Sequence, residues 1–179
     1  MKNQVEKIIL MGVAGCGKSS VGVALGAALA LPYRDGDDLH PAANIAKMSR
    51  GEPLTDADRW PWLALVGQAL RGPGIMGCSA LKRVYRALID REAGGGVVFV
   101  HLSGSRAVIE GRMRARTGHF MPPALLDSQF ATLEVPASDE RAVVVDIDQP
   151  LAAVVAEIIA KLRGLGLAAG GSPPDPEDI

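Results

Sequence analysis

Short apolar runs alternate along the chain with longer segments in which apolar residues recur every three or four positions. The runs span 5–11, 31–34, 75–78, 97–102 and 142–147. Their nearly uniform apolar character is typical of parallel strands that helices cover on both faces. We therefore predict an α/β fold built on a parallel sheet.

The segments between the runs predict the helices. The first helix should begin directly after the glycine-rich segment that follows the first run, because Val21, Leu25 and Leu29 share a face at helical spacing. The remaining helices are expected over about 53–70, 80–91, 105–116, 123–133 and 151–162. The last of them has the most regular apolar periodicity in the chain, whereas the strand at 75–78 is weakened by Gly77.

The helix expected over 53–70 has a clear beginning and end. Thr55 or Asp56 is the candidate cap, and the sequence Arg-Gly-Pro-Gly at 71–74 stops the helix. Its inward face is expected to carry Trp60, Leu63, Val66 and Leu70.

The length and composition indicate a single domain, and the net charge favours no particular class of binding partner. The chain has 179 residues, 48% of them hydrophobic, and a net charge of −1. Its basic residues are dispersed, so neither nucleic acid nor an anionic membrane is favoured as a partner. No apolar stretch reaches about 18 residues, and we expect a cytoplasmic protein. A single domain is predicted over 1–167, followed by a disordered tail at 168–179 with few core-forming residues.

The segment 12–19, Gly-Val-Ala-Gly-Cys-Gly-Lys-Ser, matches the phosphate-binding pattern G-x-x-x-x-G-K-S/T without a mismatch. It lies between the first apolar run and a predicted helix, so a helix N-terminus would point at the anion. Lys18 would reach the β- and γ-phosphates, and the Ser19 hydroxyl would bind Mg²⁺. The residues expected to hold ATP are Gly12, Val13, Ala14, Gly15, Cys16, Gly17, Lys18, Ser19 and Ser20.

Three broad classes use such a loop: regulatory GTPases, motor or transport ATPases, and small kinases. A GTPase needs an N-K-x-D segment to recognise guanine, and the sequence has none. A motor ATPase usually needs a longer chain and a strand that ends in a metal-binding acid, whereas the run 97–102 leads into Ser103-Gly104. A small kinase needs an acid near the acceptor hydroxyl, an acceptor pocket and an arginine-bearing lid. The sequence offers candidates for all three.

Several further motifs resemble gluconokinase of the thermoresistant type. They are Asp35-Gly36-Asp37-Asp38-Leu39-His40-Pro41, Gly51-Glu52-Pro53-Leu54, Pro61-Trp62-Leu63, Cys78-Ser79-Ala80-Leu81-Lys82, Gly118-His119-Phe120, Gln129-Phe130 and Asp146-Ile147-Asp148-Gln149-Pro150. The resemblance extends from Ile8 to Leu162. It implies a P-loop kinase fold with five parallel strands, flanking helices and a mobile lid. It also implies ATP-dependent phosphorylation of D-gluconate to 6-phosphogluconate by a homodimer.

The acidic turn after the second run holds candidate catalytic groups. Asp35 could accept the proton of the acceptor hydroxyl or hold the metal through water, and its alternative role is a turn or helix cap. Asp37 is well placed to hydrogen-bond sugar hydroxyls, whereas Asp38 fits a solvated turn equally well. His40 is either a polar pocket wall or a capping group.

Two basic residues are candidates for the acceptor site. Arg59 offers a planar fork suited to the carboxylate of gluconate, and its alternative is a surface ion pair with Asp56 or Asp58. Lys82, near the start of a predicted helix, could direct positive charge toward the substrate or the transferring phosphoryl group.

A lid is expected over 114–130. Arg116 is the candidate for contact with the transferring phosphate, while Arg106 and Arg114 fit solvated charges. His119 could close over the substrate, although a loop histidine also serves simply to anchor packing.

Three residues outside the loop are assigned to the nucleotide. Arg112, one turn before Arg116, is expected near adenine, and the resemblance adds Gln149 and Pro150. Two departures from the family pattern are a short connection before Cys78 and Ala87 in place of an aspartate.

Two rival functions remain at this stage. A kinase for another small hydroxy acid, such as shikimate, would show a Gly-Gly-Gly turn where this chain has Cys78-Ser79-Ala80. A nucleotide-binding relic without turnover is opposed by the intact candidate residues. Cys16 and Cys78 are expected to be free thiols, either inert or able to form a redox pair beside the loop.

Overall fold

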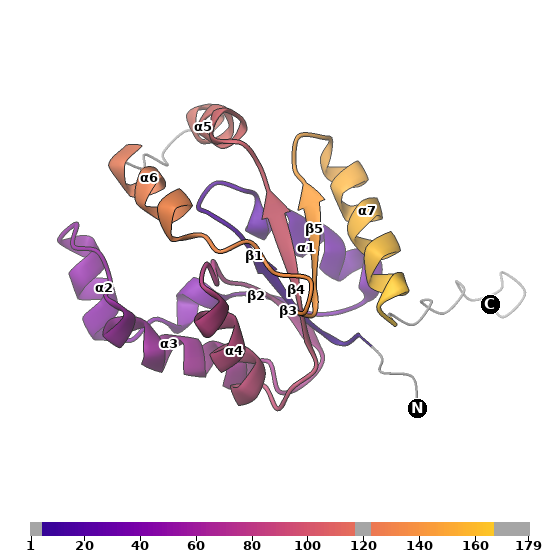
Figure 1. The fold of residues 1–179 in the computed structure, drawn as a ribbon, viewed down its shortest axis with the longest axis horizontal. Helices are drawn as coiled ribbons and strands as arrows, with labels where there is room; N and C mark the ends of the chain where they lie inside the picture. Colours follow the sequence, from indigo (N-terminus) through magenta and orange to yellow (C-terminus); the bar gives the residue numbers. More distant parts are fainter. Residues whose placement is uncertain (1–4, 117–122, 167–179) are drawn as a thin grey trace, which may run out of the picture.

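The computed structural model describes residues 5–116 and 123–166, which form a five-stranded parallel sheet with helices on both faces (Figure 1). The strand order is β2-β3-β1-β4-β5, and every neighbouring pair is parallel. The strands are β1 Lys7–Met11, β2 Tyr33–Asp35, β3 Gly74–Gly77, β4 Val97–Ser103 and β5 Ala142–Asp146. The α/β class and the five parallel strands are therefore confirmed.

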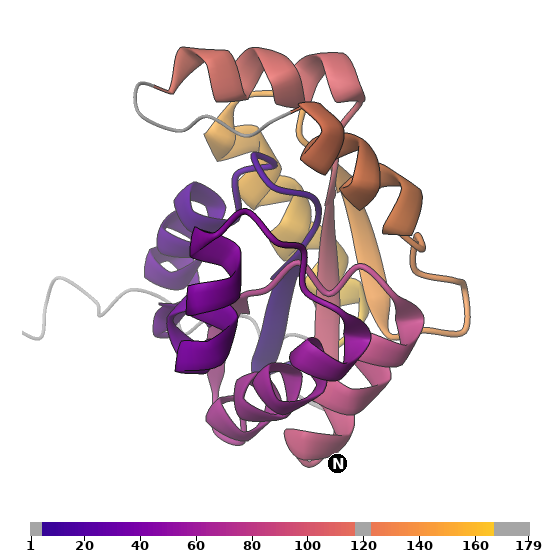
Figure 2. The ribbon, with the colours of Figure 1, turned by 90° about the vertical axis from the view of Figure 1, so that its left-hand side faces the viewer.

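The helices divide between the two faces and one end of the sheet. Residues of α1 and α7 join one core cluster, and residues of α3 and α4 join the other. α5 and α6 lie beyond the carboxyl ends of the strands (Figures 1 and 2). The helices are α1 Lys18–Leu29, α2 Ala42–Ser49, α3 Asp56–Ala69, α4 Arg83–Glu92, α5 Arg106–Ala115, α6 Pro123–Thr132 and α7 Leu151–Gly164, with a 3-10 turn at Gly36–Leu39.

Burial on both faces explains the uniform apolar character of the three inner strands, β1, β3 and β4. In β1, Ile8 and Leu10 face the cluster under α1 and α7, while Ile9 and Met11 face the cluster under α3 and α4. All four side chains are fully buried. A polar residue at any of these four positions would lose its hydration without a partner, so all four are apolar.

The sheet order places the functional loops together. β1 and β3 are neighbours in the sheet. The connection after β1 leads to β2 on one side, whereas the connection after β3 leads to β4 on the other side. In open α/β sheets, ligands bind at the carboxyl ends of the strands where the order reverses in this way. The phosphate-binding loop after β1 and the turns after β2 and β3 therefore share one edge.

The prediction that Trp60 lies on the buried face of α3 is wrong. The Trp60 side chain is 38% exposed, whereas Trp62 is 4% exposed and donates its indole N–H to the carbonyl of Gly36 at 2.8 Å. The buried face passes through Trp62 and Leu63, followed one turn later by Val66. Trp60 lies at its margin and contacts the edge of the Tyr85 ring. The prediction of Thr55 as the cap is confirmed by a reciprocal capping box with Asp58.

Other element boundaries also differ from the predictions. The sequence analysis missed α2, a short helix with only Asn44 buried, because most of its side chains face solvent. α4 begins at Arg83 rather than near 80, because Ala80 adopts a positive φ of 44° that no helix contains. The predicted tail at 168–179 lies outside the described residues, as does the middle of the predicted lid.

Candidate active site

The loop between β1 and α1 is shaped by three glycines with positive φ: Gly12 at 146°, Gly15 at 81° and Gly17 at 97°. A Cβ on Gly12 would lie 2.8 Å from the Cys16 sulfur, and one on Gly15 would lie 2.7 Å from Met113. Backbone strain and lack of space therefore both require glycine. Because Gly17 caps α1 without a side chain, the first N–H groups of the helix remain available to an anion.

Lys18 lies over this loop. Its ammonium group donates to the carbonyls of Gly12 at 3.0 Å and Val13 at 3.1 Å, and it contacts the Cys16 sulfur at 3.7 Å. Positive charge is thus added to the N-terminus of α1, where the helix dipole already favours an anion. The expected role of Lys18 at the phosphates is consistent with this position.

The acidic turn after β2 lies beside the loop. Tyr33, at the start of β2, contacts both α1 and β3, because its ring fills the space left by Gly22 and its hydroxyl lies against Gly77. That hydroxyl is buried without a hydrogen-bond partner among the described residues. Burial raises the pKa of Tyr33, the nearby Ser19 hydroxyl opposes the shift, and Asp35 adds to it. Ser19 and Asp35 therefore both lie near enough to the Tyr33 hydroxyl to affect its pKa.

This donor set fits Mg²⁺. Ser19 supplies a hydroxyl, and Asp35 and Asp37 supply carboxylates, which are hard oxygen ligands of the kind that Mg²⁺ prefers, directly or through water. Among the described residues, no group of three histidine, cysteine or acidic side chains forms a ready metal cage. A site with few protein ligands is the usual arrangement for Mg²⁺ carried in with phosphates.

Asp35 also has the local role that the sequence left open. It ends β2 and accepts the backbone N–H of Asp37 at 2.9 Å, which caps the 3-10 turn. The pKa of Asp37 is raised by desolvation and by the Asp35 carboxylate, although its side chain keeps 75% of its surface exposed and water limits the shift. The two carboxylates thus stand close enough to influence one another at the sheet edge.

His40 forms a wall of the site. Its ring stacks on Trp62 with centroids 4.0 Å apart, and Asn44 approaches its Nδ1 at 3.3 Å. Only 6% of the side chain is exposed, and burial lowers the pKa of His40 despite the opposing effect of Asp37. His40 is therefore neutral near pH 7. The polar-wall interpretation fits the side chain, while the cap at this position comes from its backbone N–H.

The two basic acceptor candidates meet at Asp56, which was expected from the sequence as a cap or as an ion-pair partner of Arg59, but not as a partner of Lys82. Arg59 lies 3.6 Å from its carboxylate and Lys82 lies 3.3 Å from it. The Tyr85 hydroxyl donates to the same carboxylate, and both cations lie over the Tyr85 ring. Hydrogen bonds from Tyr85 and Lys82 lower the pKa of Asp56, and the Asp56 carboxylate raises that of Lys82. The ion pair expected as the alternative for Arg59 is thus present, with Asp56; Asp58 pairs instead with Lys47 at 2.7 Å.

On the nucleotide side, Arg112 connects the loop with the segment between β5 and α7. Its guanidinium donates to the carbonyl of Ile147 and lies 3.5 Å from the position that a Cβ on Gly17 would take. Gln149 donates to Glu157 and to the carbonyl of Asp146, both at 2.7 Å, and Pro150 caps α7. The structure therefore brings Arg112 to the loop, while Gln149 and Pro150 shape the neighbouring turn.

The predicted lid is described only in part. Arg116 is exposed at the end of α5, and His119 lies outside the described residues. Arg106 pairs with Glu110 and Asp127, and Arg114 approaches Glu110 at 3.8 Å, as expected of solvated charges.

Three residues of this region were missed as functional candidates. Gln129 in α6 accepts the backbone N–H of Ala14 at 2.6 Å. Tyr85 and Arg86 contact the turn around Lys82. Their position next to motif residues was the available signal, but α4 also exposes other charged residues, so spacing alone could not select them.

Both cysteines are buried and free. Burial raises the pKa of Cys78 to about 12, so its thiolate is scarce at neutral pH. These observations favour the inert alternative over the redox pair.

The sheet order, the glycine-rich loop at the N-terminus of α1 and the acidic turn beside it define a P-loop kinase. No family model matches the sequence. The thermoresistant gluconokinase of Escherichia coli K12 is 46% identical over 162 residues, which covers 87% of this chain and 92% of that protein. The chain therefore belongs to the gluconokinase family.

Solved structures agree. A gluconokinase from Sinorhizobium meliloti 1021 is 52% identical, with a TM-score of 0.85, over 90% of this chain and 94% of that chain. Shikimate kinase from Aquifex aeolicus VF5 covers 91% of this chain and 99% of its own with a TM-score of 0.59, but its 20% identity shows a shared fold alone. Within 5–116 and 123–166, no helix has the length and apolar character needed to span a membrane.

Proposed function

We propose that the protein transfers the γ-phosphoryl group of ATP to the 6-hydroxyl of D-gluconate and forms 6-phospho-D-gluconate and ADP. One observation carries the proposal: a complete phosphate-binding loop meets the acidic turn at 35–37 on one sheet edge, in a member of the gluconokinase family. In the reaction, the bond between the γ-phosphorus and the β–γ bridging oxygen breaks. A bond to the sugar 6-oxygen forms, and the hydroxyl proton passes to a base.

The phosphates are held by the loop in this proposal. The N–H groups at the start of α1 bind them, and Lys18 exchanges its contacts with Gly12 and Val13 for the β- and γ-oxygens. Ser19 and Asp35 would hold Mg²⁺, which supplies charge neutralisation at the phosphates when bound. Asp35 is also the candidate base for the 6-hydroxyl, because it ends the strand that faces the loop.

The acceptor would bind between the acidic turn and the Asp56 cluster. Arg59 takes the gluconate carboxylate through its planar fork, while Asp37 and His40 hydrogen-bond the sugar hydroxyls. Lys82 stabilises negative charge on the transferring group. The ion pairs with Asp56 hold both cations in place before the substrate arrives, which lowers the ordering cost of binding.

The remaining assignments stay predictions. Arg112, Gln149 and Pro150 would border the nucleotide, and Arg116 with His119 would act from the lid as it closes. A homodimer and a cytoplasmic location, both expected from the sequence, are part of the proposal; light scattering coupled to gel filtration tests the first.

An ADP-release assay with Mg-ATP and a panel of acceptors tests the function. Gluconate should stimulate ADP release, whereas glucose and shikimate should not, and mass spectrometry should find one phosphate on gluconate. Glucose tests the need for the carboxylate, and shikimate tests the rival substrate. Equal turnover of glucose, or no turnover of gluconate, would overturn the assignment.

A further inference from the structure

In the turn between β3 and α4, the carbonyls of residues 79–82 all accept hydrogen bonds. The Ser79 carbonyl accepts the N–H of Gly12 from the phosphate-binding loop at 3.2 Å, and the Leu81 carbonyl accepts the N–H of Glu134 at 2.8 Å. The carbonyl of Lys82 accepts two N–H groups of α4. This turn ends in Lys82, so its position decides where the ammonium group can reach.

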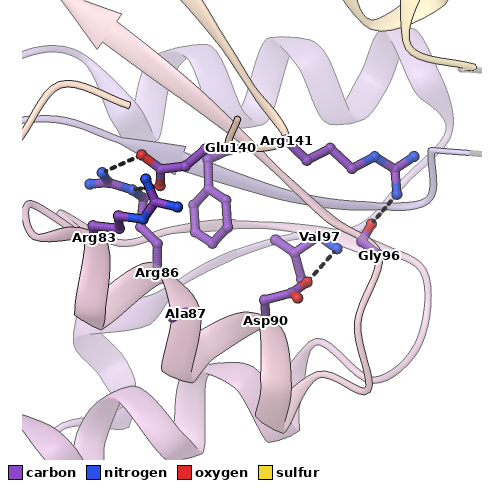
Figure 3. Close-up of a pocket in the computed structure, with 9 residues that line it drawn as sticks. Arg83, Arg86, Ala87, Asp90, Gly96, Val97, Glu140 and Arg141 are labelled. Carbon is purple, nitrogen blue, oxygen red and sulfur yellow. Dashed lines mark hydrogen bonds and ion pairs between the residues drawn. The ribbon is translucent and has the colours of Figure 1, made fainter. Parts of the chain in front are cut away.

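The Arg86 side chain supplies the remaining support. Its Nη1 donates to the carbonyl of Ala80 at 2.9 Å and to that of Leu81 at 3.2 Å. The other two nitrogens form a bidentate pair with Glu140, at 2.7 and 3.0 Å (Figure 3). Only 2% of Arg86 is exposed. All three guanidinium nitrogens are therefore used, two on the acid and one on the turn.

Glu140 is fixed in its own right. Its carboxylate also accepts the backbone N–H of Ala137 at 2.8 Å, and the hydrogen bond from Arg86 lowers its pKa. The pair thus ties α4 to the segment that leads into β5. A pairing this well satisfied fixes geometry, whereas the burial of two charges makes it a weak source of stability.

The turn needs such support because its backbone is strained. Ala80 has a φ of 44°, in the left-handed region that residues with a Cβ seldom occupy. Strained backbone persists only where surrounding contacts determine it, and it gathers at functional sites. Here those contacts are the guanidinium of Arg86 and the N–H of Gly12.

A pocket of about 240 Å³ opens beside this pair, between α4 and the start of β4 (Figure 3). The charged groups on its wall are already engaged: Arg83 with Asp139, Asp90 with the N–H of Val97, and Arg141 with the carbonyl of Gly96. We therefore assign no ligand to the pocket. The function of this region lies in the turn that Arg86 holds.

We propose that Arg86 is a positioning residue for phosphoryl transfer, acting through the 79–82 turn to set the place of Lys82. The inference rests on the proposed function, because it takes Lys82 as a group that contacts the substrate. Arg86 itself, buried behind the turn, contacts no substrate.

The test compares Arg86→Lys with Arg83→Lys. Each variant replaces a guanidinium group that forms a bidentate ion pair with a carboxylate. Arg83, however, pairs with Asp139 at the surface, and its side chain makes no hydrogen bond to the turn carbonyls among the described residues. Arg86→Lys should lower kcat by at least about tenfold, since a shift of about 1 Å in a reacting group can cost about 100-fold. KM for ATP should change less than about twofold, because the substitution replaces no residue of the phosphate-binding loop. Arg83→Lys should leave both constants unchanged.

A double variant separates positioning from folding. Arg86→Met with Glu140→Met removes the buried charges together, so the protein should remain folded while the turn loses its support. Its kcat should also fall. Hydrogen exchange of the Gly12 and Glu134 amides, which bond to the turn, should be faster in both Arg86 variants than in Arg83→Lys.

The outcomes are distinct. Wild-type kcat in the folded double variant, or a loss of kcat that only follows the melting temperature, would overturn the inference. If the wild-type protein fails to phosphorylate gluconate, the proposed function fails, and the exchange measurement still tests whether Arg86 holds the turn. Unchanged exchange at Gly12 and Glu134 would then reject the inference separately.

Discussion

The side-chain carbonyl of Gln129 accepts the backbone N–H of Ala14 at 2.6 Å, which joins helix α6 to the phosphate-binding loop. The two residues are 115 positions apart in the chain. The contact places an uncharged amide beside a loop that is built to receive phosphates. A charge at this position should therefore act directly on nucleotide affinity.

Gln129→Glu should raise KM for ATP roughly tenfold, equivalent to about 1.4 kcal/mol, because the new carboxylate would repel the phosphates. KM for gluconate should change less. Thr132→Glu, one turn along α6 and partly exposed, controls for added charge on the helix. An equal effect of the two variants on ATP would show that Gln129 has no special relation to the loop.

Lys18→Ala should abolish turnover while the protein stays folded. Among the described residues, the ammonium group bonds to loop carbonyls and a sulfur only, so its loss removes charge at the phosphates and leaves the core intact. A fall in kcat of more than about 100-fold is expected for the loss of a group that stabilises transition-state charge. Steady-state kinetics measure the fall, and circular dichroism with a melting curve checks the fold. Activity near the wild-type level would reject the phosphate-loop mechanism.

Arg59→Lys should mainly weaken the binding of gluconate. Lysine keeps the charge and can still pair with Asp56, but it loses the planar fork. KM for gluconate should rise about thirtyfold, equivalent to about 2 kcal/mol, within the roughly 1.5 to 3 kcal/mol typical of a hydrogen bond to a charged group. KM for ATP, measured in the same preparations, serves as the internal control. A selective loss of ATP affinity would instead assign Arg59 to the nucleotide.

The sequence predicted the centre of the sheet because β1, β3 and β4 are buried on both faces and so read as apolar runs. The phosphate-binding loop was equally clear, since its glycines are fixed by local backbone geometry at Gly12, Gly15 and Gly17. Both features depend on neighbours in the sequence. They needed no knowledge of how distant segments meet.

The features that were not predicted depend on contacts between residues that are distant in the sequence. Asp56 joins Arg59 to Lys82, which lies on a different element, and Arg86 pairs with Glu140 across 54 positions. A helical period cannot distinguish these charged residues from solvated ones. The orientation of Trp62 likewise depends on the carbonyl of Gly36, which only the fold brings within reach.

His101 should make the protein sensitive to acid. This β4 residue is 2% exposed, and its Nδ1 has no hydrogen-bond partner among the described residues. Burial, followed by the nearby charge of Arg86, lowers the pKa of His101 to about 4. The unfolded chain takes up the proton near pH 6.5, whereas the folded protein resists it until about pH 4. Stability is therefore present above about pH 6.5 and is lost as the pH falls toward 4.

The variant His101→Phe removes this titration and fills the site with an apolar ring. Urea unfolding at pH 7.5 and 4.5 should show that the wild type loses roughly 2 to 3 kcal/mol more than the variant, from a shift of about 2.5 pKa units. His40, whose pKa burial also lowers, remains in both proteins, so its contribution cancels in the comparison. An identical loss of stability in the two proteins would mean that His101 takes up its proton as readily in the folded state as in the unfolded one.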